Sequence, residues 1–316
     1  MRAENSNENT SSNHAVSKIE KAGILLLDKK PGLTSFETLN QVKKTFSTPK
    51  VGHTGTLDKF ASGLLVVLVG RAVKLVPWFE SCDKRYEGII RFGEETATLD
   101  PEGEVIARAP VPGRERLEEA LSRFRGDILQ APPLYSAIHL DGVRAHELAR
   151  RGVQVVMEKR PVSIFNLELV SYEPPLAEIN VHCSKGAYIR SLARDIALEA
   201  GSRGHLASLK RTRVAGFTLE DASNFELKPI SPEVFNALGL PVLEADDEAV
   251  GALIRGKPID PLFNRGKIGF RGNSPAPEWT GGQKKQAAGV FDTQGGFVAV
   301  IQKNDSWKYG YVYAHT

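Results

Sequence analysis

One segment constrains the fold of this chain more than any other: the loop GHTGTLDKFASG, which runs directly into six consecutive aliphatic residues. The loop carries three glycines, Gly52, Gly55 and Gly63, and glycine reaches backbone conformations that are closed to other residues. The aliphatic run at residues 64–69 is short, rich in valine and bounded by glycine on both sides, which predicts a fully buried strand rather than a helix. The carboxylate of Asp58 is therefore expected on a loop that a rigid strand anchors.

Asp58 has two interpretations. An isolated aspartate in a loop more often tightens a turn than carries chemistry, so residues elsewhere must decide. Arg190 falls in the first turn of a helix predicted over residues 188–200, where a cation opposes the helix macrodipole, and this favours a carboxylate partner. Asp58 is the candidate, and a cation within about 4–6 Å would keep it ionised and nucleophilic at neutral pH. A solvated Arg190, or one that contacts a surface phosphate, is the open alternative.

Composition bounds the class of protein. With 316 residues, 41% hydrophobic and 25% charged, the chain is typical of a globular protein with two domains. A net charge of +3 permits a nucleic-acid partner without requiring one. Cys82 and Cys183 lack zinc-site or disulfide-framework spacing, which favours a reducing compartment, so we expect a cytoplasmic protein. Residues 1–20 lack a signal-peptide core and predict a disordered tail, and no apolar run reaches membrane-spanning length.

Periodicity predicts mixed strands and helices in no strict βαβ order. Strands are expected at residues 24–27, 64–69, 86–92, 161–172 and 177–183, and helices at 34–46, 114–124 and 188–200. In the first helix Thr34 and Glu37 form a capping box, and Phe36, Leu39, Val42 and Phe46 share one apolar face.

Two regions differ from this core in character. Residues 131–161, with Pro132-Pro133 and a short basic helix around Arg150, read as an insertion. A boundary falls near residues 232–246, and the short apolar runs after it, joined by a two-residue turn at Gly295-Gly296, predict a small β-rich module.

Aromatic residues beside cations suggest a pocket for nucleic acid. Arg85-Tyr86 and the Tyr188 to Arg190 segment suit stacking on a planar base together with contact to its phosphates, although half-buried packing is the usual role of a strand tyrosine. Between residues 185 and 213 the chain carries seven cations against two acids, which predicts a phosphate-binding track. The cations are Lys185, Arg190, Arg194, Arg203, Lys210, Arg211 and Arg213.

Several ordered motifs together resemble the TruB family of tRNA pseudouridine synthases. They are KPGLTS at residues 30–35, KVGHTGTLD at 50–58, RY at 85–86, the insertion, YIRSL at 188–192 and LKR at 209–211. The resemblance runs from about residue 22 to 225. It implies an α+β fold with a mixed, mostly antiparallel sheet, flanking helices and a central cleft. The implied domains are a catalytic domain at 21–240, with the insertion as a thumb, and a PUA-like RNA-binding module at 241–316.

The resemblance also assigns roles in catalysis. Asp58 would be the catalytic aspartate, Arg190 its ion-pair partner and Tyr86 the aromatic that stacks on the target uracil. Tyr188 would line the same pocket, and His53 would occupy the place that the flipped-out nucleotide leaves.

Further residues are assigned to substrate binding. Lys30 would support the active-site loop, Leu209 would form a wall of the pocket, and Lys210 and Arg211 would contact RNA. Two residues depart from the family pattern: His139 stands where Lys is common, and His146 where Tyr is common. Both lie in the thumb, so they bear on RNA contacts rather than on the chemistry.

The expected reaction is conversion of uridine to pseudouridine at position 55 in the T loop of tRNA. It exchanges an N–C glycosidic bond for a C–C bond without redox change or hydrolysis, so we expect no cofactor and no metal. We expect a monomer without an obligate protein partner or membrane attachment. Two alternatives stay open: a tRNA-binding or folding module with secondary or lost catalysis, and a synthase that acts within a guide-RNA complex.

Overall fold

The computed structural model describes residues 21–136, 138–140, 143–144, 151, 155–223, 225–271, 286–303 and 305–313. The predicted tail at residues 1–20, His146, most of the predicted basic helix and residues 272–285 lie outside these ranges. Only the backbone of His139 is described.

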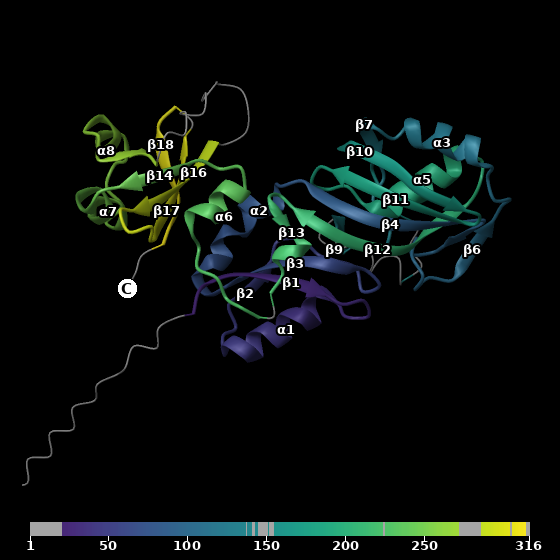
Figure 1. The fold of residues 1–316 in the computed structure, drawn as a ribbon, viewed down its shortest axis with the longest axis horizontal. Helices are drawn as coiled ribbons and strands as arrows, with labels where there is room; N and C mark the ends of the chain where they lie inside the picture. Colours follow the sequence, from purple (N-terminus) through teal and green to yellow (C-terminus); the bar gives the residue numbers. More distant parts are fainter. Residues whose placement is uncertain are drawn as a thin grey trace, which may run out of the picture.

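The described elements form two main sheets of different size, with helices packed against each (Figure 1), and two small two-stranded sheets, β5-β6 and β8-β9. In chain order they are β1 (Gly23–Lys29), α1 (Ser35–Phe46), β2 (Val51–His53), β3 (Ser62–Val69), the 3₁₀ helix η1 (Gly70–Leu75), α2 (Val76–Glu80), β4 (Lys84–Phe92), β5 (Glu94–Thr96), β6 (Val105–Arg108), α3 (Arg114–Ser122), β7 (Gly126–Gln130), β8 (His139–Leu140), β9 (Val143–Arg144), β10 (Arg160–Glu173), β11 (Leu176–Cys183), α5 (Ile189–Glu199), β12 (Gly204–Val214), β13 (Phe217–Thr218), the 3₁₀ helix η2 (Leu219–Asp221), α6 (Pro232–Ala237), β14 (Val242–Ala245), α7 (Asp247–Ile254), α8 (Asp260–Asn264), β15 (Ile268–Phe270), β16 (Gln286–Asp292), β17 (Phe297–Lys303) and β18 (Trp307–Val312).

The larger sheet has the order β1-β3-β12-β4-β11-β10-β7, with β2 added beside β3 and β13 beside β12. Its pairs are antiparallel except β3 with β12. The predicted α+β architecture with a mixed, mostly antiparallel sheet is therefore confirmed.

The aliphatic strand β3 is buried on both faces, which explains its unbroken apolar sequence. Alternate residues such as Leu65 and Val67 join a core cluster with Leu39 and Val42 of α1. The intervening residues face a second cluster that includes Phe79 of α2 and reaches the C-terminal sheet. The predicted buried strand is confirmed, because a strand covered on both sides has no solvent-facing positions for polar residues.

Helix α1 confirms the predicted capping box and, except for Phe36, the predicted apolar face, since Leu39, Val42 and Phe46 pack on the core. The Thr34 hydroxyl accepts a hydrogen bond from the Glu37 N–H, and the Glu37 carboxylate accepts one from the Thr34 N–H. Phe36, however, is 64% exposed, because the buried face is formed by Ser35, Thr38, Leu39 and Val42. Each helical residue advances about 100° around the axis, so Phe36 points away from the face on which Ser35 lies.

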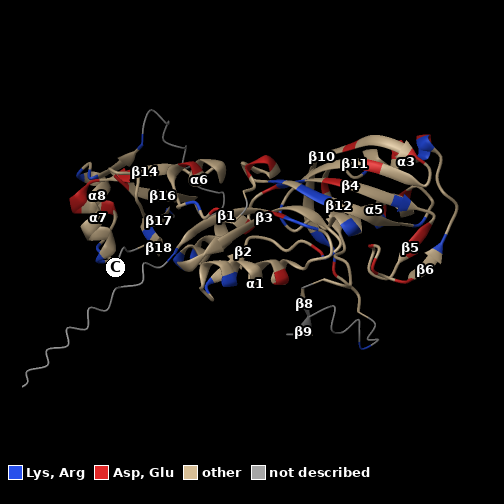
Figure 2. Ribbon diagram, turned by 60° about the horizontal axis from the view of Figure 1, so that its bottom comes forward, with Lys and Arg blue, Asp and Glu red and all other residues tan. Residues whose placement is uncertain are grey.

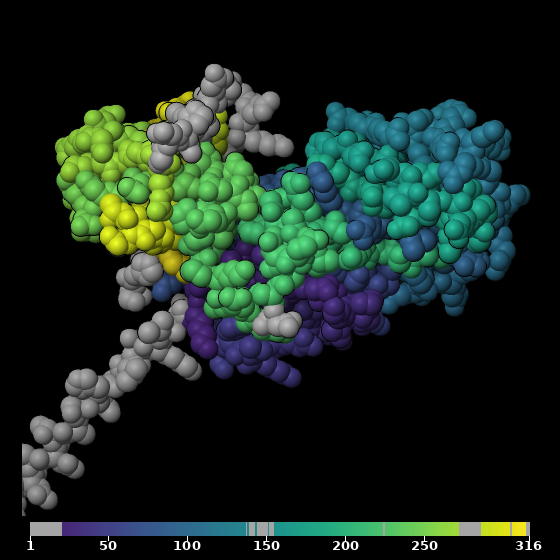
Figure 3. All heavy atoms as spheres, viewed as in Figure 1, coloured from purple at the N-terminus to yellow at the C-terminus, as the bar shows by residue number. Residues whose placement is uncertain are grey.

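The C-terminal residues form a five-stranded sheet of order β15-β14-β16-β17-β18, covered by α7 and α8 and visible as a separate lobe in Figure 3. The Arg71 guanidinium lies 4.9 Å from the Tyr313 ring centroid, which joins this lobe to the part of the chain that forms the larger sheet. The predicted two-residue turn is wrong: four residues separate β16 from β17. The Asp292 carboxylate accepts hydrogen bonds from the N–H groups of Gln294 and Gly296, and this stabilises the longer turn.

Candidate active site

A cavity of about 1040 Å³ lies where the loop after β2 meets β4, β12 and the start of α5. It brings together seven of the nine predicted site residues, which are His53, Asp58, Tyr86, Tyr188, Arg190, Leu209 and Arg211. The other two line no part of it. Lys30 is exposed and contacts Asp28, and Lys210 lies 3.5 Å from a carboxylate oxygen of Glu87.

Buried side chains hold the Asp58 loop through its backbone. The Ser35 hydroxyl accepts a hydrogen bond from the Leu57 N–H at 2.9 Å and donates one to the Leu57 carbonyl at 3.0 Å. On the other side of Asp58, the Lys29 ammonium donates to the carbonyls of Ala61, at 2.6 Å, and Lys59, at 3.5 Å. Lys29, which is 1% exposed, thus supports the active-site loop, the role predicted for Lys30. The sequence could have indicated Lys29, because alternate residues of a strand face opposite sides and β1 turns Asp28 outward and Lys29 inward.

Arg211 ties the same loop to the sheet. It is 2% exposed, and its guanidinium donates to the carbonyls of Leu64, at 2.8 Å, and Gly55, at 3.0 Å. Of the three loop glycines, only Gly63 has positive φ, at +100°, and a Cβ there would lie 2.3 Å from the Arg211 carbonyl oxygen. Gly52 and Gly55 therefore do not adopt the glycine-only conformation that was predicted, whereas Gly63 does and cannot be replaced without strain.

The predicted ion pair between Asp58 and Arg190 is present. Arg190 Nη2 donates a hydrogen bond to Asp58 Oδ1 at 3.0 Å, and Arg190 Nε lies 3.0 Å from Asp58 Oδ2. The second contact lacks hydrogen-bond geometry, because the Nε–H group has no aligned acceptor. The Arg190 side chain is 6% exposed and that of Asp58 is 36% exposed, so the carboxylate faces the cavity while its partner lies behind it.

Arg190 also contacts a second carboxylate, which the sequence did not reveal. Its Nη1 donates to Asp100 Oδ2 at 3.1 Å and to the Thr98 carbonyl at 2.8 Å, and Nη2 donates to the Tyr135 carbonyl at 3.0 Å. The Asp100 side chain is 6% exposed. In the sequence Asp100 is an ordinary turn residue 90 positions from Arg190, so only the fold could identify it.

These contacts change the expected electrostatics of Asp58. Burial raises its pKa above the ordinary aspartate value, Arg190 opposes this, and the nearby Asp100 carboxylate raises the pKa again. Arg190 favours the ionised form of Asp58, as predicted, but the pKa is raised because burial outweighs the guanidinium. Asp58 is therefore a stronger base when ionised than a solvent-exposed aspartate.

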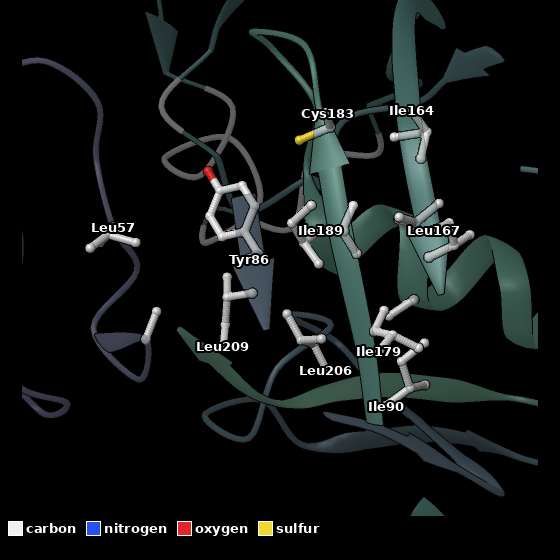
Figure 4. Close-up of a cluster of buried hydrophobic side chains, with 14 of the residues drawn as sticks. Leu57, Tyr86, Ile90, Ile164, Leu167, Ile179, Cys183, Ile189, Leu206 and Leu209 are labelled. Carbon is white, nitrogen blue, oxygen red and sulfur yellow. The ribbon is translucent and has the colours of Figure 1, made fainter. Parts of the chain in front are cut away.

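Apolar and aromatic side chains form the wall beside Asp58. Figure 4 shows the Tyr86 ring among Leu57, Ile189 and Leu209, with its hydroxyl directed away from the aliphatic cluster. Burial raises the pKa of the Tyr86 phenol, so it stays neutral. Such a wall suits the flat face of a planar ring.

His53 supplies a neutral imidazole at the same cavity. Burial lowers its pKa below the ordinary histidine value, and the Arg211 cation lowers it further. Its Nδ1 accepts a hydrogen bond from the Gly55 N–H at 3.3 Å, which leaves the ring proton on Nε2.

The predicted phosphate-binding track differs from the structure. Arg190 and Arg211 are buried. The other cations except Lys185 face carboxylates: Arg194 with Asp195, Arg203 with Glu95, Lys210 with Glu87 and Arg213 with Asp83. Figure 2 shows basic and acidic residues interspersed on this sheet. The cations are clustered in sequence, but acids from other segments partner three of them.

The position of Arg85 also differs from the predicted pocket, in which Tyr86 would stack on a base and Arg85 would contact its phosphate. It neighbours Tyr86 on β4, but alternate residues of a strand face opposite sides of the sheet. Tyr86 is buried beside the cavity, and Arg85 is exposed on the other face. The pair therefore cannot serve one pocket.

The site combines a carboxylate of raised pKa, a fixed guanidinium behind it, a neutral imidazole and an aromatic wall. Such a carboxylate can attack an electrophilic carbon or remove a proton from a planar substrate in the cavity. Among the described residues, no group of three His, Cys, Asp or Glu side chains is arranged to hold a metal ion. None of the described helices is both long and apolar enough to span a membrane.

Comparisons of sequence identify relatives over most of the chain. A model of the TruB family pseudouridylate synthase N-terminal domain matches residues 43–189. The chain is 47% identical over 204 residues to tRNA pseudouridine synthase B of Borreliella burgdorferi (strain ZS7), covering 64% of this chain and 72% of that protein. It is 41% identical over 248 residues to the same enzyme of Chromobacterium violaceum, covering 75% and 81%.

A comparison of structures extends the likeness to the fold as a whole. A chain from an H/ACA RNP bound to a substrate RNA containing 2'-deoxyuridine superposes with a TM-score of 0.64. The match covers 93% of this chain and 85% of that one at 20% identity.

Proposed function

Because this chain belongs to the TruB family of pseudouridylate synthases, we propose that it converts uridine 55 in the T loop of tRNA to pseudouridine. Membership makes it an isomerase. We take tRNA as the substrate because the relatives are named as tRNA pseudouridine synthases, and we infer the position within tRNA. The observation that carries the proposal is the Asp58–Arg190 pair, which faces a cavity walled by Tyr86.

The geometry supports an order of roles for the residues. A uridine within a folded loop must leave its stack to reach Asp58, at a cost of a few kcal/mol. Stacking of the extruded base on Tyr86 offsets this cost, and His53 would fill the space left in the RNA. Asp58 then acts on the sugar or the base to break the N-glycosidic bond, and the detached uracil turns in the cavity before the C–C bond forms.

The C-terminal sheet is proposed as a PUA-like RNA-binding module. Two observations support this: it is built as a separate five-stranded sheet with its own apolar core, and aromatic contacts join it to the catalytic half. It would then hold the part of the tRNA that extends beyond the cavity.

The proposed function predicts a single product site. We expect an unmodified tRNA transcript, incubated with the protein in EDTA and without added cofactor, to gain pseudouridine at position 55 alone. A transcript with cytidine at that position is the control. Site-resolved mapping of pseudouridine makes the measurement, and modification at another uridine, or none, would contradict the proposal.

Because Arg190 is shared between Asp58 and Asp100, we predict how turnover depends on pH. Turnover requires ionised Asp58, so kcat should fall as the pH falls through the raised pKa of this carboxyl. We expect Asp100→Asn to move this acidic limb to lower pH, because it removes a like charge that raises the pKa of Asp58. Glu102→Gln, which removes a weaker and more exposed charge, should shift the limb less. Profiles of kcat against pH test this, and an upward shift in Asp100→Asn would refute the assignment.

A further inference from the structure

Phe36 is an aromatic side chain that the core does not use. The ring is 64% exposed and lines the cavity that holds Asp58. Single exposed apolar residues are common, so exposure by itself indicates nothing. Among the described residues one other phenylalanine is more than half exposed, Phe165 at 57%, and it lines no part of this cavity. Position, rather than exposure, distinguishes Phe36.

The backbone under Phe36 is rigidly held. The capping box of Thr34 and Glu37 encloses it, and the neighbouring Ser35 exchanges two hydrogen bonds with Leu57, the residue before Asp58. Any ligand contact made by Phe36 is thus fixed relative to the catalytic carboxylate. The same cavity is lined by Tyr135 and Ser136, which belong to the predicted thumb insertion.

A lysine ammonium lies over one face of the Phe36 ring. Lys43, two turns further along α1, places its ammonium 5.2 Å from the Phe36 ring centroid. The opposite face remains for a flat partner, and the ammonium lies where it can also meet a phosphate. An exposed aromatic beside a cation at the mouth of a cavity is the arrangement that binds single-stranded nucleotides by stacking.

We propose that Phe36 is a stacking platform for the nucleobase next to the uridine that enters the cavity. This inference rests on the proposed function, since it takes an RNA loop as the ligand. A base extruded from its loop leaves its neighbours without a stacking partner on one side. A ring mounted at the rim replaces that partner and so stabilises the opened loop.

The test uses the full chain and a T-arm RNA hairpin carrying 2-aminopurine in turn on each side of the target uridine. Binding of the wild-type chain should quench the fluorescence at one of these positions. Phe36→Ala should abolish the quenching and raise Kd and KM about 5- to 100-fold, with kcat changed far less. Phe36→Trp should restore both, and Phe165→Ala, the matched control, should behave as wild type.

The outcomes separate this inference from the function on which it rests. Normal modification of position 55, with quenching and Kd in Phe36→Ala within twofold of wild type, would overturn the platform alone. Quenching that depends on Phe36, without modification of position 55, would support the platform and overturn the reaction. A change in oligomeric state on Phe36→Ala, with RNA binding intact, would show that the ring contacts protein and would also overturn the inference.

Discussion

Asp58→Asn is expected to lower kcat by about 10⁴-fold or more while tRNA binding stays within about threefold of wild type. The amide has the size of the carboxylate, and its oxygen can still accept the hydrogen bond that Arg190 Nη2 donates at 3.0 Å. It carries no negative charge, so it can neither attack a carbon nor remove a proton. Single-turnover formation of pseudouridine and direct titration of tRNA separate the two effects.

Asp28→Asn is the matched control for this variant. The Asp28 side chain is 38% exposed, close to the 36% of Asp58, and it also pairs with a cation, but it lies outside the cavity. Its kcat should equal that of wild type. If Asp58→Asn kept more than a few per cent of wild-type turnover, another group would have to perform the chemistry.

Stability gives a second readout for Asp58→Asn. Folding raises the pKa of Asp58, so at neutral pH the charge on this carboxylate opposes folding. The variant should therefore unfold at an equal or higher urea concentration than wild type at pH 7. The difference should vanish as the pH falls below the ordinary aspartate pKa, because both side chains are then neutral. A loss of activity with unchanged or increased stability is typical of a functional residue.

Local patterns in the sequence predicted the parts of the site that local structure controls. The aliphatic run indicated β3, the capping box indicated the start of α1, and the position of Arg190 in the first turn of α5 indicated its need for a carboxylate. Each of these inferences depends on neighbours within a few residues, where backbone geometry limits the alternatives. The pairing of Asp58 with Arg190 followed because both residues had an unexplained charge.

The rest of the site depends on which segments the fold brings together. Asp100 reaches Arg190 through the excursion between β4 and α3, and nothing near Asp100 in the sequence marks it as buried. Lys29 likewise becomes a support for the Asp58 loop only because β1 pairs with β3 and brings it beside Ala61. The predicted basic track failed for the same reason, since three of its neutralising acids come from β5, from β4 and from Asp83, just before β4.

Arg190→Lys is expected to cause the second large loss of turnover, because the guanidinium that it replaces is shared between two carboxylates. Arg190 contacts both Asp58 and Asp100 and also donates to the Thr98 and Tyr135 carbonyls. A lysine ammonium has three donors at one point and cannot span this arrangement. We expect kcat to fall about 100-fold or more, because the catalytic carboxylate loses its fixed orientation.

The matched control for this substitution is Arg194→Lys. Arg194 lies one turn further along α5 and pairs with Asp195 at 2.8 Å, but it does not line the cavity. Its variant should keep wild-type turnover, since a half-buried pair outside the site tolerates a point charge. Equal losses in the two variants would indicate that α5 is destabilised as a whole and that Arg190 has no special position.

The pH profile shows how Arg190→Lys acts. Arg190 lowers the pKa of Asp58 against the effects of burial and Asp100, so a more distant cation should let that pKa rise further. The acidic limb of kcat then moves to higher pH in Arg190→Lys and to lower pH in Asp100→Asn. In Arg190→Ala the buried Asp100 carboxylate loses its cation, and we expect a loss of about 3–5 kcal/mol in the free energy of unfolding. Limbs that move in the same direction for Arg190→Lys and Asp100→Asn would contradict a guanidinium shared between two carboxylates, because the first substitution moves a cation away from Asp58 and the second removes an anion.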